Sequence, residues 1–172
     1  MLLTAWLAAM PATMSWASEY CYDWATELVT AARHCVSSVL APQQNNNYGP
    51  ANLFQERGAW CEGTSQSGIG EWITVRFNPS LFFQRIYVIN GYAKSVDTFR
   101  NNSRVKQFRI DTSSGLVTYV DLKDNPREQI IHLPQKVNAS WIRFTVTDIY
   151  RGKKYSDTCL SKLIVDIEEY QR

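Results

Sequence analysis

The stretch Trp72-Ile-Thr-Val-Arg-Phe77 alternates apolar and polar side chains with a period of two. Ile73, Val75 and Phe77 fall on one side of this segment, whereas Thr74 falls on the other. Successive side chains of a β-strand point to opposite faces of the sheet, so this alternation is what a strand with one buried face requires. The stretch therefore predicts a half-buried β-strand whose apolar side faces the core.

Similar segments follow along the chain, each rich in β-branched or aromatic residues and each bounded by turn residues. They are Ile86 to Asn90, Val105 to Asp111, Leu116 to Leu122, Gln129 to Leu133, Trp141 to Asp148 and Leu160 to Ile167. Asp111-Thr-Ser-Ser-Gly115 has the composition of a hairpin connection, with Gly115 available for a positive φ. Six or more short strands without helices between them indicate an antiparallel sandwich or barrel.

The segment 18–35 is harder to assign. Trp24, Leu28 and Ala31 or Ala32 recur at helical spacing, which favours a short helix or an irregular segment before the sandwich. The stretch Gln43 to Pro50 then predicts a loop, because Asn, Gly and Pro favour turn geometry. We expect one β-sandwich domain over residues 36–172, since a chain of 172 residues fits a single domain.

The first 17 residues contain no charged side chain and end in the small-x-small pattern Ser15-Trp-Ala17. This pattern predicts a secretory signal peptide cleaved after Ala17, although no Lys or Arg follows Met1. A retained anchor or a different start codon stays open as an alternative. The apolar run is too short and too broken for a membrane span, so we expect a secreted or periplasmic bacterial protein without a transmembrane segment after cleavage.

Four cysteines in an exported chain are expected to pair, and four allow three pairings. We favour Cys61 with Cys159, because both lie beside long polar loops, which leaves Cys21 with Cys35. No Cys-x-x-Cys motif exists and the two histidines lie far apart in the sequence, so a zinc site is not expected.

The net charge argues against a nucleic-acid-binding protein, and the motifs argue against an enzyme. A formal net charge of +2 is far from that of a nucleic-acid binder. No Gly-x-Ser-x-Gly motif is present, and His34 and His132 offer few candidates for a general base. Glu62 and Glu71 could form a carboxylate pair of the glycosidase type, but Glu71 is better interpreted as ordering its loop. We therefore expect no enzymatic activity.

Sugar binding fits the loop residues better, because a pyranose offers an apolar face to an aromatic ring and hydroxyls to polar side chains. The loops combine aromatic, amide, carboxylate and basic groups in this way. The candidate ligand-binding residues are Asn90, Tyr92, Lys94, Asn102, Arg104, Tyr150, Lys154, Tyr155, Asp157, Trp60 and Glu62. Each of them also has a structural interpretation, as turn, core or cap residue.

Five segments together resemble a known family: Ala59-Trp-Cys-Glu-Gly63, Gly68-Ile-Gly-Glu-Trp-Ile73, Asn90-Gly-Tyr-Ala-Lys-Ser95, Asn102-Ser-Arg-Val-Lys106 and Tyr150-Arg-Gly-Lys-Lys-Tyr-Ser-Asp-Thr-Cys159. In this order they are similar to the galactose-binding-like, discoidin-type (F5/8 type C) domains, among them the translocation or glycan-binding domain of streptococcal NAD glycohydrolase. The resemblance runs from about Val36 to Ile167. It implies a jelly-roll β-sandwich and carbohydrate binding, and it does not imply NAD hydrolysis.

The chain departs from the family pattern where such domains often hold calcium. Glu56-Arg57-Gly58 and Ser161-Lys162 stand where an Asp-Gly and a Ser-Glu pair are usual. Calcium requires several oxygen ligands, and basic side chains at these positions argue against a structural ion. No cofactor is expected.

Two hypotheses about function follow. In the first, the protein is a secreted, non-catalytic module that binds a glycan or another cell-envelope ligand through loops at one end of the sandwich. In the second, the loops dock an envelope protein or anionic lipid, with Arg151, Lys153 and Lys154 supplying a local positive charge. In that role the protein would be an accessory to a toxin or to a secretion or translocation system.

Overall fold

The computed structural model describes residues 20–25, 31–54 and 58–167. The expected signal peptide, residues 1–17, lies outside the described residues. The elements in chain order are β1 (Tyr20–Trp24), β2 (Ala31–Val36), the 3-10 helix η1 (Pro50–Leu53), β3 (Trp60–Cys61), β4 (Trp72–Asn90), α1 (Val96–Asn101), β5 (Ser103–Thr112), β6 (Val117–Asp121), β7 (Glu128–Tyr150) and β8 (Thr158–Asp166). Among the described residues, no helix has the length and apolar character needed to cross a bilayer.

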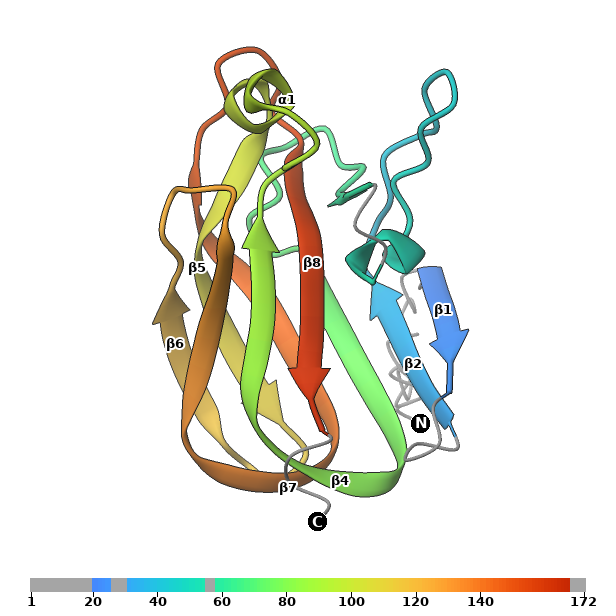
Figure 1. Ribbon diagram of the computed structural model, residues 1–172, viewed down its shortest axis with the longest axis vertical. Coiled ribbons are helices and arrows are strands. Elements are labelled where there is room, and N and C mark those ends of the chain that lie inside the picture. Colours follow the sequence, from blue (N-terminus) through green and yellow to red (C-terminus); the bar gives the residue numbers. More distant parts are fainter. Residues whose placement is uncertain (1–19, 26–30, 55–57, 168–172) are drawn as a thin grey trace, which may run out of the picture.

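The strands form two layers joined by two long strands, β4 and β7, which bend and run through both (Figure 1). The first layer has the order β1, β2, β4 up to Asn78, β7 from Trp141, β5 and β6. The second has the order β7 up to Ala139, β4 from Leu81, β8 and β3. The predicted antiparallel jelly-roll sandwich is confirmed, and pairs of predicted strands prove to be the two halves of β4 and of β7.

The bend in β4 occurs at the cis peptide bond Asn78-Pro79, where the register with β7 shifts between Arg76 and Leu81. Proline lacks the N–H that a regular ladder needs, so it suits the point at which a strand leaves one layer for the other.

The core lies between the layers and is built from the predicted alternation. Ile73 and Val75 are fully buried, and Phe77 is 5% exposed. The rings of Phe108 on β5 and Phe144 on β7 pack edge to face with centroids 5.7 Å apart. The predicted hairpin is also confirmed, because β5 pairs with β6 and Gly115 has a φ of 87°.

The helix expected within residues 18–34 is wrong where the chain is described, since β1 and β2 form an antiparallel pair that continues the first layer. Leu28, on which the helical spacing depended, lies outside the described residues. Ala32, His34 and Val36 alternate inward, and Cys21 lies directly opposite Cys35 in the ladder. Sheet pairing and a disulfide thus outweigh a weak local helical preference.

Both expected disulfides are present, Cys21–Cys35 and Cys61–Cys159. The second spans 98 residues of sequence and joins β3 to β8. It lies next to the loops at one end of the sandwich, where most of the candidate residues gather.

Candidate functional site

The loops at the end of the sandwich near α1 are fixed to one another by backbone hydrogen bonds. Figure 1 shows α1 and the connection between β7 and β8 at the same end of the molecule. The Ser95 side chain accepts from the Thr98 backbone N–H while the Thr98 hydroxyl accepts from the Ser95 N–H, a capping box that starts α1 directly after the 90–95 loop. The backbone N–H groups of Lys153 and Tyr155 donate to carbonyls of α1, which docks the 150–158 loop on this helix.

A buried carboxylate organises the loops on the other side of the disulfide. Glu62 is fully buried, and its carboxylate accepts hydrogen bonds from the backbone N–H groups of Thr64 and Thr158 at 2.8 and 3.1 Å. Burial raises the pKa of Glu62, an effect that these hydrogen bonds oppose. Trp60 is also fully buried, and its indole N–H donates to the Ser38 carbonyl at 2.9 Å.

The side chains of Asn90 and Arg104 bind backbone groups of neighbouring strands and loops. The Asn90 side-chain amide donates to the Val105 carbonyl at 2.7 Å and accepts from the Val105 N–H at 3.0 Å. It thus satisfies both backbone groups of Val105, as the backbone of a paired β-strand would. The Arg104 guanidinium is held by Asp124 through two hydrogen bonds of 2.9 and 2.6 Å, and it also donates to the Asn102 and Arg151 carbonyls. All of these contacts keep the loops in place.

Between these loops lies a cleft of about 370 Å³, a volume within the range of small-ligand sites. The groups that line it are tyrosine rings, amides, hydroxyls, an ammonium group and a carboxylate. They belong to Leu40, Gln43, Asn46, Tyr48, Tyr92, Lys94, Ser95, Thr98, Asn102, Tyr155 and Asp157. We call this the loop-end cleft.

Its tyrosines differ in their accessibility. Tyr48 and Tyr92 are nearly buried and pack edge to face with centroids 6.2 Å apart, while Tyr155 is 45% exposed. Burial raises the pKa of both Tyr48 and Tyr92, so their phenols stay protonated at neutral pH. The Tyr92 hydroxyl and the Lys94 ammonium both donate to the Asn46 side-chain oxygen at 3.3 Å. The cleft therefore has a rigid polar floor and one exposed ring at its rim.

Asp157 is the acidic group of the cleft. It is partly buried, and burial raises the pKa of its carboxyl above the ordinary value. In the part of the chain that the structure describes, no ion pair joins this carboxylate to a basic side chain. A half-desolvated carboxylate of this kind is a strong acceptor for hydroxyl groups.

The loop-end cleft brings together five of the residues predicted from the sequence, namely Tyr92, Lys94, Asn102, Tyr155 and Asp157. It does not include the other six. Trp60, Glu62 and Asn90 are 0% exposed, and the guanidinium of Arg104 is bound to Asp124 and to loop carbonyls, so in this structure these four side chains support the loops and do not line the cleft.

The last two candidates, Tyr150 and Lys154, are not among the residues that line the cleft. The Tyr150 hydroxyl donates to the Leu122 carbonyl at 3.0 Å, which gives this residue a structural contact. Lys154 is exposed, and its ammonium lies 5.1 Å from the centroid of the Tyr155 ring.

The sequence interpretation missed the contribution of the segment before η1. Asn46 and Tyr48 line the cleft, yet their stretch was interpreted only as a loop. The available signal was the same mixture of amides and a tyrosine that marked the other loops. Thr98 was missed because α1, which presents it, was not expected.

Ser161 and Lys162, which stand where calcium-binding relatives often carry a Ser-Glu pair, make protein contacts: the Ser161 hydroxyl donates to the Gly91 carbonyl at 2.8 Å. Lys162 pairs with Glu128 at 2.7 Å, while Glu56 and Arg57 lie outside the described residues. Within residues 20–25, 31–54 and 58–167, no three His, Cys, Asp or Glu side chains gather as a metal site would require.

Comparison with known families identifies the family to which the chain belongs. Residues 23–166 match the family described as the NAD glycohydrolase translocation F5/8 type C domain. The chain belongs to this family, as the resemblance had implied, and the match begins ahead of Val36, within β1. No curated protein sequence matches the chain.

Solved structures share the fold at low sequence identity. The family 32 carbohydrate-binding module of NanJ from C. perfringens, in complex with galactose, is 13% identical with a TM-score of 0.55 over 78% of this chain and 92% of that one. A Clostridium perfringens module in complex with GalNAc-β-1,3-galactose is 9% identical with a TM-score of 0.58 over 78% and 94%. A Ruminococcus gnavus fucosidase in complex with fucose is 17% identical with a TM-score of 0.55 over 78% of this chain and 25% of that enzyme. These likenesses show that the chain shares the β-sandwich fold of these proteins.

Proposed function

We propose that the protein is an exported, non-catalytic module that binds carbohydrate in the loop-end cleft. The observation that carries the proposal is the pairing of an exposed ring with a polar floor: Tyr155 at the rim, and Lys94 and Asp157 within one cleft. The ring can stack on the apolar face of a pyranose while the charged groups bind its hydroxyls. The sugar complexes of the similar modules and the two disulfides, which suit an oxidising compartment outside the cytoplasm, support this proposal.

The affinity is expected to be modest. One exposed ring leaves the outer side of a sugar in water, so binding between about 1 mM and 1 μM, or roughly −4 to −8 kcal/mol, is the physical expectation.

The test is calorimetric titration of the exported protein with galactose, N-acetylgalactosamine and fucose. The Tyr155→Ala and Asp157→Asn variants should each bind the preferred sugar about tenfold more weakly, because one loses the stacking ring and the other the charged acceptor. Tyr119→Ala is the matched control, since Tyr119 is 58% exposed on β6 and does not line the cleft. Unchanged affinity in both cleft variants, with cooperative unfolding retained, would remove this cleft as the sugar site.

A second candidate rests on the basic 150–158 loop. Arg151, Lys153 and Lys154 are all exposed, and Arg100 on α1 is exposed nearby, since its carbonyl accepts from the Lys153 N–H. We propose that this cluster is the contact for an anionic lipid surface or an acidic envelope protein if the module is accessory to a toxin or translocation system. Co-sedimentation with anionic vesicles should then fall as salt rises, whereas sugar binding should not.

A further inference from the structure

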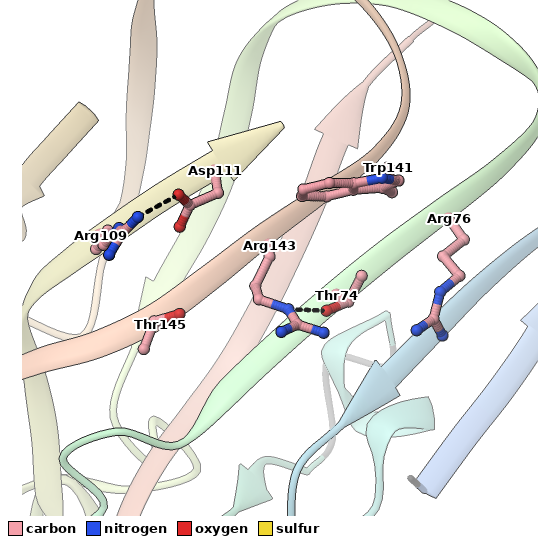
Figure 2. A pocket seen from close by; sticks show the side chains of 7 residues that line it. All are labelled: Thr74, Arg76, Arg109, Asp111, Trp141, Arg143 and Thr145. Atoms are coloured by element: carbon pink, nitrogen blue, oxygen red, sulfur yellow. Dashed lines mark hydrogen bonds and ion pairs between the residues drawn. The ribbon is translucent and has the colours of Figure 1, made fainter. Parts of the chain in front are cut away.

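A second cleft lies away from the loops, on the outer face of the first layer. It has a volume of about 540 Å³ and is lined from three adjacent strands, β4, β7 and β5. Figure 2 shows Trp141 and three arginines across this cleft: Arg76 from β4 near Trp141, Arg143 from β7 in the middle, and Arg109 from β5 beside Asp111. We call this the sheet-face cleft.

The register of the sheet arranges these residues in rungs. Arg76 pairs with Trp141 in one rung, and Arg143 lies between Thr74 and Asp111 in the next. Arg109 lies one rung further, beside Thr145. Neighbouring strands are about 4.8 Å apart and successive rungs on one face are about 6.8 Å apart, so the three arginines form a diagonal row that suits several linked anionic groups rather than one small anion.

Two of the arginines, Arg143 and Arg109, are oriented by contacts with neighbouring side chains. The Arg143 Nε donates to the Thr74 hydroxyl at 2.9 Å, and its guanidinium lies 4.3 Å from the centroid of a Trp72 ring. Arg109 donates to Asp111 at 2.8 Å. In Figure 2 the two terminal nitrogens of Arg143 make no interaction with the other six residues drawn. The guanidinium is therefore held in place and still offers donors to the cleft.

The charge and the rings distinguish this face from an ordinary solvated one. Three arginines and one carboxylate, that of Asp111, line the cleft. Trp141 is half-buried in the same cleft. Arginine and tryptophan, with tyrosine, are enriched at the hot spots of interfaces, and both combine a flat surface with directed donors.

The strands themselves limit what can bind. β4, β7 and β5 each have a partner strand on both sides in this layer, so their backbone groups are engaged in the sheet. An extended peptide is usually captured by such backbone groups at a free edge, which this face does not present. Recognition here must come from side chains that stand up from the sheet, and these offer a stacking ring with arginine forks.

We propose that the sheet-face cleft binds an acidic saccharide, with Trp141 stacking on a sugar ring and the arginines binding its carboxylate or sulfate groups. Arginine forks match such planar or tetrahedral oxyanions with paired hydrogen bonds. This site is separate from the loop-end cleft and does not rest on sugar binding there.

The test is calorimetric titration of the exported protein with a sulfated heparin hexasaccharide and an oligogalacturonate, which distinguish sulfate from carboxylate. Maltohexaose and hexaglutamate serve as the neutral saccharide and the acidic peptide. At least one acidic saccharide should bind, and the R76Q/R109Q variant should bind it at least tenfold more weakly. Trp141→Ala should also weaken it, and Tyr155→Ala should leave it unchanged.

The matched control is K123Q/R127Q, which also removes two positive charges, from exposed residues of the connection between β6 and β7. Equal losses in the two double variants would show attraction to net charge alone and overturn the proposal. Equal binding of hexaglutamate would overturn the assignment to a saccharide, and binding of none of the acidic ligands would overturn the site itself. A cooperative thermal transition in each variant establishes that the comparison is made on folded protein.

Discussion

The two clefts use arginine in opposite ways. At the loop end, Arg104 is 8% exposed and its guanidinium makes four hydrogen bonds, two to Asp124 and two to carbonyls of the loops. On the sheet face, Arg109 is exposed and donates to the neighbouring Asp111. The difference shows where each surface obtains its shape. Loops lack a ladder of their own and need buried polar groups beneath them, whereas a sheet already fixes its side chains and leaves the charged ones available.

Removal of the Cys61–Cys159 disulfide should have the largest effect, and it should affect the two clefts differently. This bond closes a loop of about 100 residues, and the C61A/C159A variant should lose up to about 4.7 kcal/mol of unfolding free energy, as measured by urea denaturation. The Cys21–Cys35 bond closes a much shorter loop, so the C21A/C35A variant should lose about 3 kcal/mol. In the folded C61A/C159A protein, neutral-sugar binding should fall while acidic-saccharide binding persists. A larger cost for C21A/C35A would contradict this ranking.

Substitution of the two arginines tests the contrast directly. Arg104→Met should lower the unfolding free energy by about 3 kcal/mol, because it leaves Asp124 and two loop carbonyls without their donor. Arg109→Met removes a surface ion pair and should cost at most about 1 kcal/mol. Chemical denaturation of both variants measures the difference, and comparable losses would show that the two arginines have the same structural role.

A fall in pH should change the free energy of unfolding in opposite directions through groups at the β1–β2 pair and groups at the loop end. Full burial lowers the pKa of His34 from 6.5 to about 3, so the unfolded chain binds the proton more tightly than the folded protein does. The contribution of His34 to stability is complete above pH 6.5 and is lost as pH falls toward 3, by about 1.4 kcal/mol per pH unit, or about 2 kcal/mol between pH 6.5 and 5. The loss should fall on the β1–β2 pair, where the Trp24 indole donates to His34 Nδ1 at 2.9 Å.

At the loop end the sign is reversed. Burial raises the pKa of Glu62 and of Asp157, so their folded forms hold protons more tightly, and their contribution to stability is lost as pH rises through the folded pKa. Between pH 5 and 7 the unfolding free energy should rise with pH because of His34; His34→Asn should remove this rise, and His132→Asn, at an exposed position, should retain it. A slope that survives in His34→Asn would assign it to other groups.

Salt should give the smallest effect and separates the clefts in one titration series. Between about 50 and 500 mM salt, binding of an acidic saccharide at the sheet face should weaken about tenfold, because exposed charges are screened. Neutral-sugar binding at the loop end should change by less than about twofold. Parallel salt sensitivity of both ligands would indicate that they share one site.

Much of the fold could be predicted from alternation alone. The stretch Trp72 to Phe77 identified its own buried face, and the hairpin at Asp111 to Gly115 followed from turn chemistry. The sequence also indicated both disulfides. The β1–β2 pair was missed because a short segment with mixed spacing takes its structure from the strand beside it, here β4.

The candidate sites were less predictable, for a physical reason. Asn90 and Tyr92 are two residues apart and chemically equally suited to a sugar, yet Asn90 fills its bonds with the Val105 backbone while Tyr92 lines the cleft. Arg76, Arg109 and Arg143 are far apart in the sequence and are brought together only by the register of three strands. Residue type shows what a side chain can bind, and neighbours show whether those bonds are already taken.

For this protein, the sequence by itself determined the class of fold, the alternation that fills the core and the kind of chemistry its loops carry. These properties are local, set by side-chain periodicity, turn residues and composition. Only the tertiary structure decided which polar groups form hydrogen bonds that hold the loops and which face solvent. Glu62 and Arg104 are buried and belong to the first group, whereas Tyr155 is exposed and belongs to the second. That division depends on burial and strand register, which arise from contacts between residues remote in the chain.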